Sequence, residues 1–88
     1  MFTNHAEMRC QQRGIQREVV DALLSYGKRG HHRGAQVYFM DKRAHRHARA
    51  DMGKSVYGRI ANRLDTYLVV SGDGVVITAA KRLGRLKF

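Results

Sequence analysis

Apolar residues between positions 15 and 24 recur at the spacing of an amphipathic helix. Charged residues occupy the opposite side of that helix, and Gly27 is placed to end it. The intervals of three, four and seven residues, typical of a buried helical stripe, are set by Ile15, Val19, Val20, Leu23 and Leu24. This segment is the clearest helix that the pattern predicts.

A shorter helix is predicted before it, over residues 3–13. Asn4 can cap its start, Glu7 follows three residues later as in a capping box, and Gly14 stops it. At 100° per residue, one face of this helix carries His5, Arg9, Gln12 and Arg13. Because the connection to the next helix is short, we expect the two helices to form a corner.

The pattern of residues 28–50 predicts a loop and strands, and residues 43–50 leave the choice between strand and helix open. Residues 28–34 are interpreted as a loop, residues 35–40 as a strand, and Asp41-Lys42 as a turn. If residues 43–50 form a strand, one of its faces carries Arg43, His45, His47 and Arg49. If they form a helix, this stripe disappears. Hairpin geometry favours the strand.

The last third predicts a short helix and a hairpin. Residues 55–64 have apolar positions at helical spacing, although Gly58 weakens a helix and leaves a strand open as the alternative. Residues 67–71 and 75–79 flank a Gly-Asp-Gly turn, which predicts an antiparallel hairpin. Its continuous apolar runs are typical of central strands covered on both faces.

Together these elements predict an α+β fold with a single domain over residues 1–88. Two N-terminal helices pack on one face of a mostly antiparallel sheet of about four strands. The other face is expected to be open, at least in part, and to carry the basic stripe.

Charge narrows the choice of partner. Lysine and arginine total 17 against 7 acidic residues, so the formal net charge is +10 with histidine neutral. A small domain needs a net charge of only about 2–8 for solubility, so the excess indicates a polyanionic partner. We expect RNA first, then DNA or an acidic protein.

Other classes of protein fit the sequence poorly. No apolar run approaches the roughly 20 residues of a membrane span, and the N-terminus lacks the apolar core of a signal peptide. The single cysteine, Cys10, excludes an intramolecular disulfide and a cysteine-rich zinc site. We therefore expect a cytoplasmic protein that needs no metal and no small-molecule cofactor.

The opening motif His5-Ala6-x-x-Arg9-x-x-x-Arg13-Gly14-Ile15 resembles the start of a family of small bacterial proteins of unassigned function. That family is grouped with the RelE/ParE-like and BrnT-like toxins, within the barnase-like ribonuclease superfold. The second helix, ending at Tyr26-Gly27, and the closing hairpin at residues 69–78 are similar to it as well. The resemblance implies a RelE/BrnT-like fold, metal-independent endoribonuclease activity and pairing with an acidic antitoxin protein.

One departure from the family matters for catalysis. Many relatives follow the last strand with a His-Arg pair, where this chain has Ala80-Lys81-Arg82. If that histidine is the proton donor in active relatives, Lys81 has to replace it, or this chain does not cleave RNA. A non-catalytic nucleic-acid-binding module is therefore the alternative function.

Candidate site residues follow from the chemistry of metal-free RNA cleavage. Proton transfer to and from oxygen and cations around the phosphorane are needed, which histidine and arginine supply. The catalytic candidates are His5, Arg9, Arg13, Lys81 and Arg82. The nucleic-acid-binding candidates are Arg43, His45, His47, Arg49 and Arg85. For Arg9 and Arg13 the alternative is a structural role, with their stems packed and the helix tied to the sheet edge.

Overall fold

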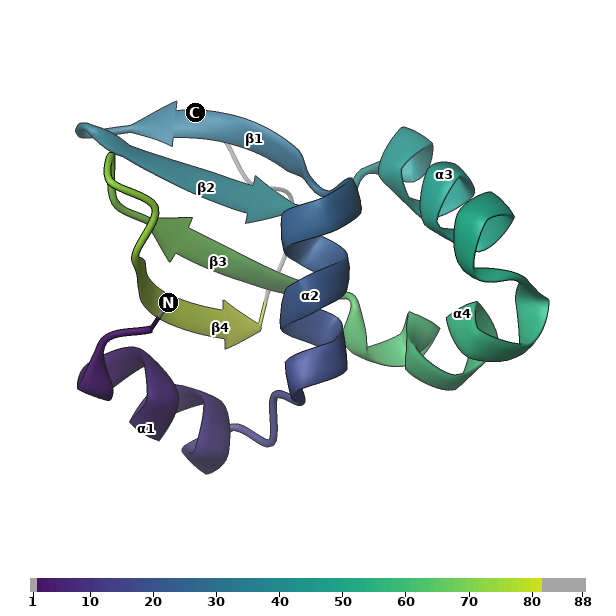
Figure 1. Ribbon diagram of the computed structural model, residues 1–88, viewed down its shortest axis with the longest axis horizontal. Helices are drawn as coiled ribbons and strands as arrows, with labels where there is room; N and C mark the ends of the chain where they lie inside the picture. Colours follow the sequence, from purple (N-terminus) through teal and green to yellow (C-terminus); the bar gives the residue numbers. More distant parts are fainter. Residues whose placement is uncertain (1, 82–88) are drawn as a thin grey trace.

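The computed structural model describes residues 2–81, in which four antiparallel strands form one sheet in the order β1-β2-β3-β4 (Figure 1). The strands are β1 Lys28–His32, β2 Ala35–Phe39, β3 Thr66–Val70 and β4 Val76–Lys81. The helices are α1 Asn4–Gln12, α2 Arg17–Tyr26, α3 Lys42–Met52 and α4 Lys54–Ile60, and a 3-10 turn covers Ala61–Arg63. The predicted α+β class, with two N-terminal helices and four antiparallel strands, is confirmed.

The N-cap of helix α1 lies one residue earlier than predicted. Thr3, and not Asn4, is the N-cap, because its backbone is extended and its hydroxyl accepts a hydrogen bond from the Ala6 amide at 3.1 Å. The backbone amide of Thr3 also donates to the Val76 carbonyl of β4 at 3.1 Å. The cap therefore fixes the start of α1 to the edge of the sheet.

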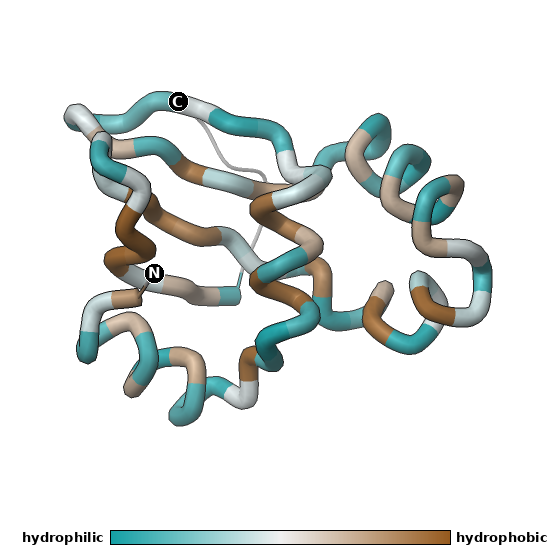
Figure 2. The backbone as a smooth tube through the Cα atoms, in the orientation of Figure 1, coloured by the Kyte–Doolittle hydropathy of each residue, from teal (hydrophilic) through white to brown (hydrophobic). Residues whose placement is uncertain are grey.

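Helix α2 buries most of its predicted stripe against the sheet. Val19, Val20 and Leu23 are at most 1% exposed, whereas Leu24 is 39% exposed and does not belong to the core. Figure 2 shows the apolar side of α2 meeting the apolar segments of the central strands. Gly27 then joins α2 to β1 where space is short, since a Cβ there would lie 2.4 Å from the Leu23 carbonyl oxygen.

Strand β1 corrects the prediction of a loop over residues 28–34. Its residues pair with β2 from Lys28↔Phe39 to His32↔Ala35. Arg33 and Gly34 both have positive φ, at 50° and 79°, as the two central residues of a type I′ hairpin turn require. The sequence pattern did not predict this turn, because Arg-Gly is a weaker hairpin signal than Asn-Gly and because β1 contains few residues that favour strands.

Helix α3 corrects the prediction of a strand over residues 43–50. Asp41, predicted to lie in a turn, is its N-cap and accepts a hydrogen bond from the Ala44 amide at 2.8 Å. Ala44 and Ala48, one turn apart, are 5% and 0% exposed and form the narrow inner side of the helix. Gly53, with φ of 88°, ends it. The basic stripe predicted for a sheet face therefore belongs to a helix.

The helix and the hairpin of the last third form as predicted, but β4 is more exposed than predicted. The helix favoured for residues 55–64 is present as α4 and the 3-10 turn, which together cover residues 54–63. Strands β3 and β4 form the expected antiparallel hairpin, with a bulge at Val69/Val70. However, β4 is an edge strand and Ile77 is 38% exposed, so it is not a central strand covered on both faces. Because β4 pairs with only one strand, its outer edge needs another partner.

The core lies between the sheet and the helices. Figure 1 shows α2 crossing one face of the sheet, α1 beside β4, and α3 and α4 beyond α2. Side chains from every helix and from β3 and β4 form one buried cluster, which includes Ala6, Leu23, Ala48, Ile60, Leu68 and Val76. On the opposite face of the sheet, Val37 and Phe39 are 6% and 8% exposed, so that face is not an open basic surface.

Candidate nucleic-acid interface

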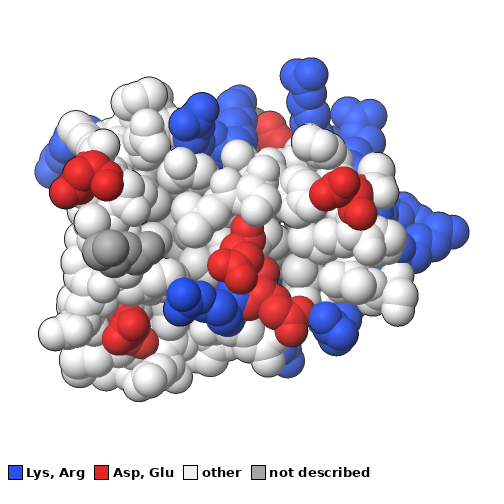
Figure 3. All heavy atoms as spheres, in the orientation of Figure 1, with Lys and Arg blue, Asp and Glu red and all other residues white. Residues whose placement is uncertain are grey.

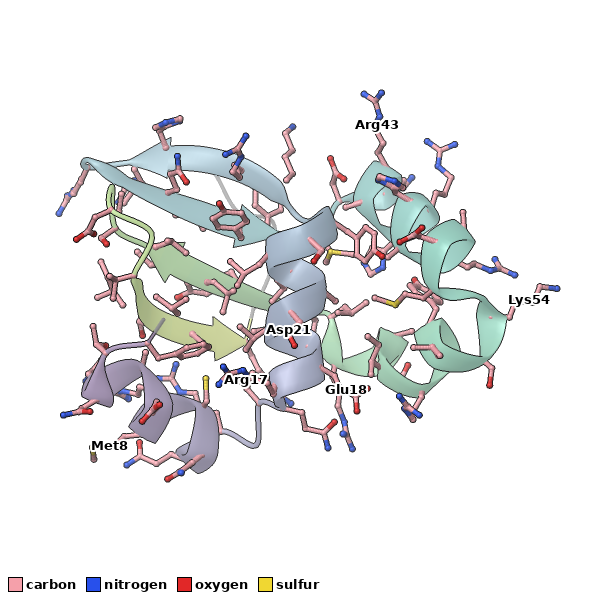
Figure 4. The ribbon with its side chains drawn as sticks, in the orientation of Figure 1. Met8, Arg17, Glu18, Asp21, Arg43 and Lys54 are labelled. Carbon is pink, nitrogen blue, oxygen red and sulfur yellow. The ribbon has the colours of Figure 1, made fainter. Side chains whose placement is uncertain are left out.

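The outer side of α3 carries a row of cations. A helix turns through about 100° per residue, so burial of Ala44 and Ala48 places the lysine and arginine side chains of α3 within an outward arc of about 120°. All of these lysine and arginine residues are exposed. We define the α3 cationic face as Lys42, Arg43, Arg46 and Arg49. Figure 4 shows Arg43 pointing away from the body of the protein, as does Lys54 at the start of α4.

The charge of this face is not neutralised within the described residues. None of its four cations forms an ion pair with any carboxylate in residues 2–81, where Arg59 pairs with Glu18 at 2.8 Å. Figure 3 shows many of the basic side chains projecting from the rim of the molecule near β1 and α3, with single acidic side chains between them. The four cations of α3, unpaired within residues 2–81, create a positive potential along this side of the helix.

The two histidines of the predicted stripe do not lie on this face. His45 is half-buried, and its Nδ1 is 2.8 Å from the hydroxyl of Tyr57 in α4. The His47 ring packs edge-on against Tyr26 of α2, with 5.4 Å between ring centroids. These contacts attach α3 to its neighbouring helices. A strand would place all four basic residues on one face, whereas in the helix both histidines turn toward the neighbouring helices and away from the outward arc of cations.

Sequence reasoning missed Lys42 and Arg46 as members of the interface. The signal that finds them is the spacing of apolar residues: Ala44, Ala48 and Met52 follow each other at four-residue intervals, after Asp41 as a cap. With that helix recognised, Lys42 and Arg46 fall on the side opposite these apolar residues.

The candidate catalytic residues of α1 are only partly brought together. His5 is exposed and Arg9 is half-buried. Arg13 donates from Nη1 to the Ala79 carbonyl of β4 at 2.9 Å, and the Thr3 hydroxyl donates to the Ile77 carbonyl at 3.4 Å. These bonds satisfy outer-edge groups of β4, so the structural alternative for Arg13 is confirmed.

Arg13 and Lys81 nevertheless share one hollow. It has a volume of about 520 Å³ and is lined by Arg13, Tyr67, Ala80 and Lys81. His5 and Arg9 are not among these lining residues. Arg82 and Arg85, also predicted as site residues, lie outside the described part of the chain. The Arg13–Lys81 hollow thus offers two cations and a phenol, without the predicted histidine.

Two perturbed groups bear on reactivity. Burial raises the pKa of the Cys10 thiol, which keeps it protonated and a poor nucleophile. The hydrogen bond to Asp51 raises the pKa of Tyr26, so its hydroxyl remains the donor that joins α2 to α3. Within residues 2–81 no three histidine, cysteine or acidic side chains gather as a metal site.

No helix among the described residues has the length and apolar character needed to cross a bilayer. The chain matches no protein-family model, no curated protein and no solved structure.

Proposed function

We propose that this protein binds RNA in the cytoplasm through the α3 cationic face. The single observation that carries the proposal is the clustering of four exposed cations, without carboxylate partners in residues 2–81, on one side of one helix. Arg43, Arg46 and Arg49 follow each other about 4.5 Å apart along the helix axis, so their long side chains can reach successive phosphates.

RNA is preferred to DNA because the N-terminal motif and closing hairpin resemble the ribonuclease-like toxin family. An acidic antitoxin-type chain would be attracted to the same face by the same charges. RNA and such a partner are then expected to compete for α3.

The second candidate function is metal-independent cleavage of the bound RNA. The observation that favours it is the meeting of Arg13, Tyr67 and Lys81 around one hollow. An arginine can stabilise the phosphorane, while a phenol and an amine can transfer protons to and from the 2′ and 5′ oxygens. We place cleavage second because Arg13 already holds β4 and no histidine lines the hollow.

The test is incubation of the purified protein with end-labelled RNA in the presence of a chelator, with binding and cleavage measured side by side. Salt-sensitive binding without cleavage supports the binding module. Cleavage that is lost in Lys81→Gln, with RNA binding retained, supports the ribonuclease. Lys81 is the better position to vary, because removal of Arg13 would also release the edge of β4. No binding to RNA at low salt would contradict both functions.

A further inference from the structure

A second cationic feature lies next to the α3 cationic face, where β1 begins beside the first turns of α3. A hollow of about 340 Å³ is lined by Tyr26, Lys28, Asp41, Arg43, Ala44 and His47. Its volume is at the lower end of the roughly 300–1,000 Å³ range of ligand pockets. The lining residues come from α2, β1, α3 and the α3 cap, so three separate parts of the fold build it.

We propose that this β1–α3 hollow binds a phosphate monoester, the terminal phosphate of an RNA strand. The proposal rests on the proposed function, since the α3 cationic face would hold the rest of that strand. Binding in the hollow would give the protein a preference for the end of an RNA strand, in addition to the sequence-independent phosphate contacts of the α3 cationic face.

The lining side chains of the hollow carry two positive charges, on Lys28 and Arg43, and one negative charge, on Asp41. Lys28 and Arg43 are both exposed, and neither has an ion-pair partner in residues 2–81. Asp41 is the one carboxylate among the six lining residues, and it accepts the amide hydrogen bond that caps α3. The nearby carboxylate of Asp51 accepts the hydroxyl hydrogen bond of Tyr26. Both carboxylates keep their negative charge, but each already accepts a hydrogen bond, whereas Lys28 and Arg43 have donors that no carboxylate in residues 2–81 engages.

The arrangement of donors suits a terminal phosphate better than an internal one. A monoester carries a charge of about −1.5 to −2 at pH 7 and three free acceptor oxygens, so it gains from donors that approach from several sides. Here Lys28 lines the hollow from β1, while Arg43 and His47 line it from α3, one turn apart. The N-terminal end of α3 also lies here and adds a favourable dipole. A diester lying on the outer face of α3 meets cations from one side only.

Arg43 links the two surfaces, because it belongs to the α3 cationic face and also lines the hollow. A strand that runs from Arg49 past Arg46 therefore reaches the hollow at Arg43. The end of the strand that enters, 5′ or 3′, is decided by the experiment below.

The first test uses adenosine 5′-monophosphate as the probe and adenosine as its control, followed by amide NMR of the full chain. We expect the monophosphate to cause saturable shifts around residues 26–29 and 41–47, and adenosine to cause none. Loss of one charged donor, in Lys28→Gln, is expected to weaken binding about tenfold. The matched control is Arg29→Gln, which removes an equal charge from the next position of β1 without touching the hollow. Absence of saturable shifts at the hollow, or equal weakening in both variants, would overturn the proposal.

The second test separates this proposal from the proposed function. Short RNAs of one sequence are compared with a 5′-phosphate, a 3′-phosphate or hydroxyls at both ends. We expect one phosphorylated end to bind more tightly than the hydroxyl RNA in wild type and in Arg29→Gln, but not in Lys28→Gln. Equal affinity for all three RNAs would contradict end recognition and leave RNA binding intact. Monophosphate binding by a protein that binds none of the RNAs would contradict both RNA binding and the RNA end as the ligand, and would leave a site for a free phosphate monoester.

Discussion

Replacement of Arg46 and Arg49 by glutamine should weaken the salt dependence of RNA binding by a defined amount. Each phosphate contact contributes about 0.7 to the slope of log K against log salt for a single strand, so two lost contacts lower the slope by about 1.4. Between about 50 and 200 mM salt, a fourfold change, this reduces the loss of affinity by roughly sevenfold. Glutamine keeps a good helix propensity and the two side chains point outward, so α3 should remain folded.

The assay is fluorescence anisotropy of labelled single-stranded RNA across a salt series. The control is Arg33→Gln/Arg63→Gln, which removes the same charge from exposed positions in the β1–β2 turn and the 3-10 turn. We expect the control to keep the wild-type slope within experimental error. Equal slopes for the two double variants would refute the assignment to α3, because net charge alone would then account for binding.

The remaining predictions concern stability and titration. Gly27→Ala should lower the free energy of unfolding by at least about 1 kcal/mol, because its Cβ would lie 2.4 Å from a backbone oxygen. The control is Gly72→Ala, which should cost much less because its Cβ would meet nothing within 4 Å. Urea denaturation compares the two variants, and equal midpoints would contradict the steric reasoning. Ala48→Leu should destabilise the protein by about 1–3 kcal/mol, since the position is 0% exposed and has no room for three more carbons; an unchanged urea midpoint would show that α3 packs loosely. The hydrogen bond from Ser71 lowers the pKa of Asp73, so its contribution to stability is present above the ordinary aspartate pKa and is lost as the pH falls through the lowered value. Carboxyl NMR should therefore show Asp73 titrating at higher pH in Ser71→Ala, and an identical titration would remove Ser71 as the cause.

The parts of the fold that the sequence predicted well are those with repeated apolar spacing. Val19, Val20 and Leu23 identify α2, and the Gly-Asp-Gly turn identifies the last hairpin. Both signals are local, since each element carries its own periodicity or turn. Strand β1 has neither signal. It forms because its backbone pairs with β2 across the Arg33-Gly34 turn, and backbone pairing leaves little trace in composition.

The candidate site was predicted in composition but not in geometry. Residues 43–50 are predicted as the basic surface, yet their mixture of alanine, arginine and histidine fits a strand face as well as a helix face. Helix formation is decided by the cap at Asp41 and by the burial of Ala44 and Ala48 against neighbouring helices. That packing is tertiary, so the sequence alone left the choice between helix and strand open. The choice between helix and strand determines which cations face outward together.

For Arg13, the sequence identified a residue of structural importance but left two interpretations of its role open. Its arginine side chain fits either phosphate contact or attachment of α1 to the sheet edge. The bond to the Ala79 carbonyl confirms the attachment, and the hollow shared with Lys81 leaves phosphate contact as a proposal.

The measurement that tests the central proposal most directly is an amide NMR titration of the full chain with a short single-stranded RNA in the presence of a chelator. If the α3 cationic face is the interface, the largest saturable shifts will fall between Lys42 and Arg49 and will weaken as salt is raised. Shifts confined to the Arg13–Lys81 hollow, or no shifts at low salt, would contradict it.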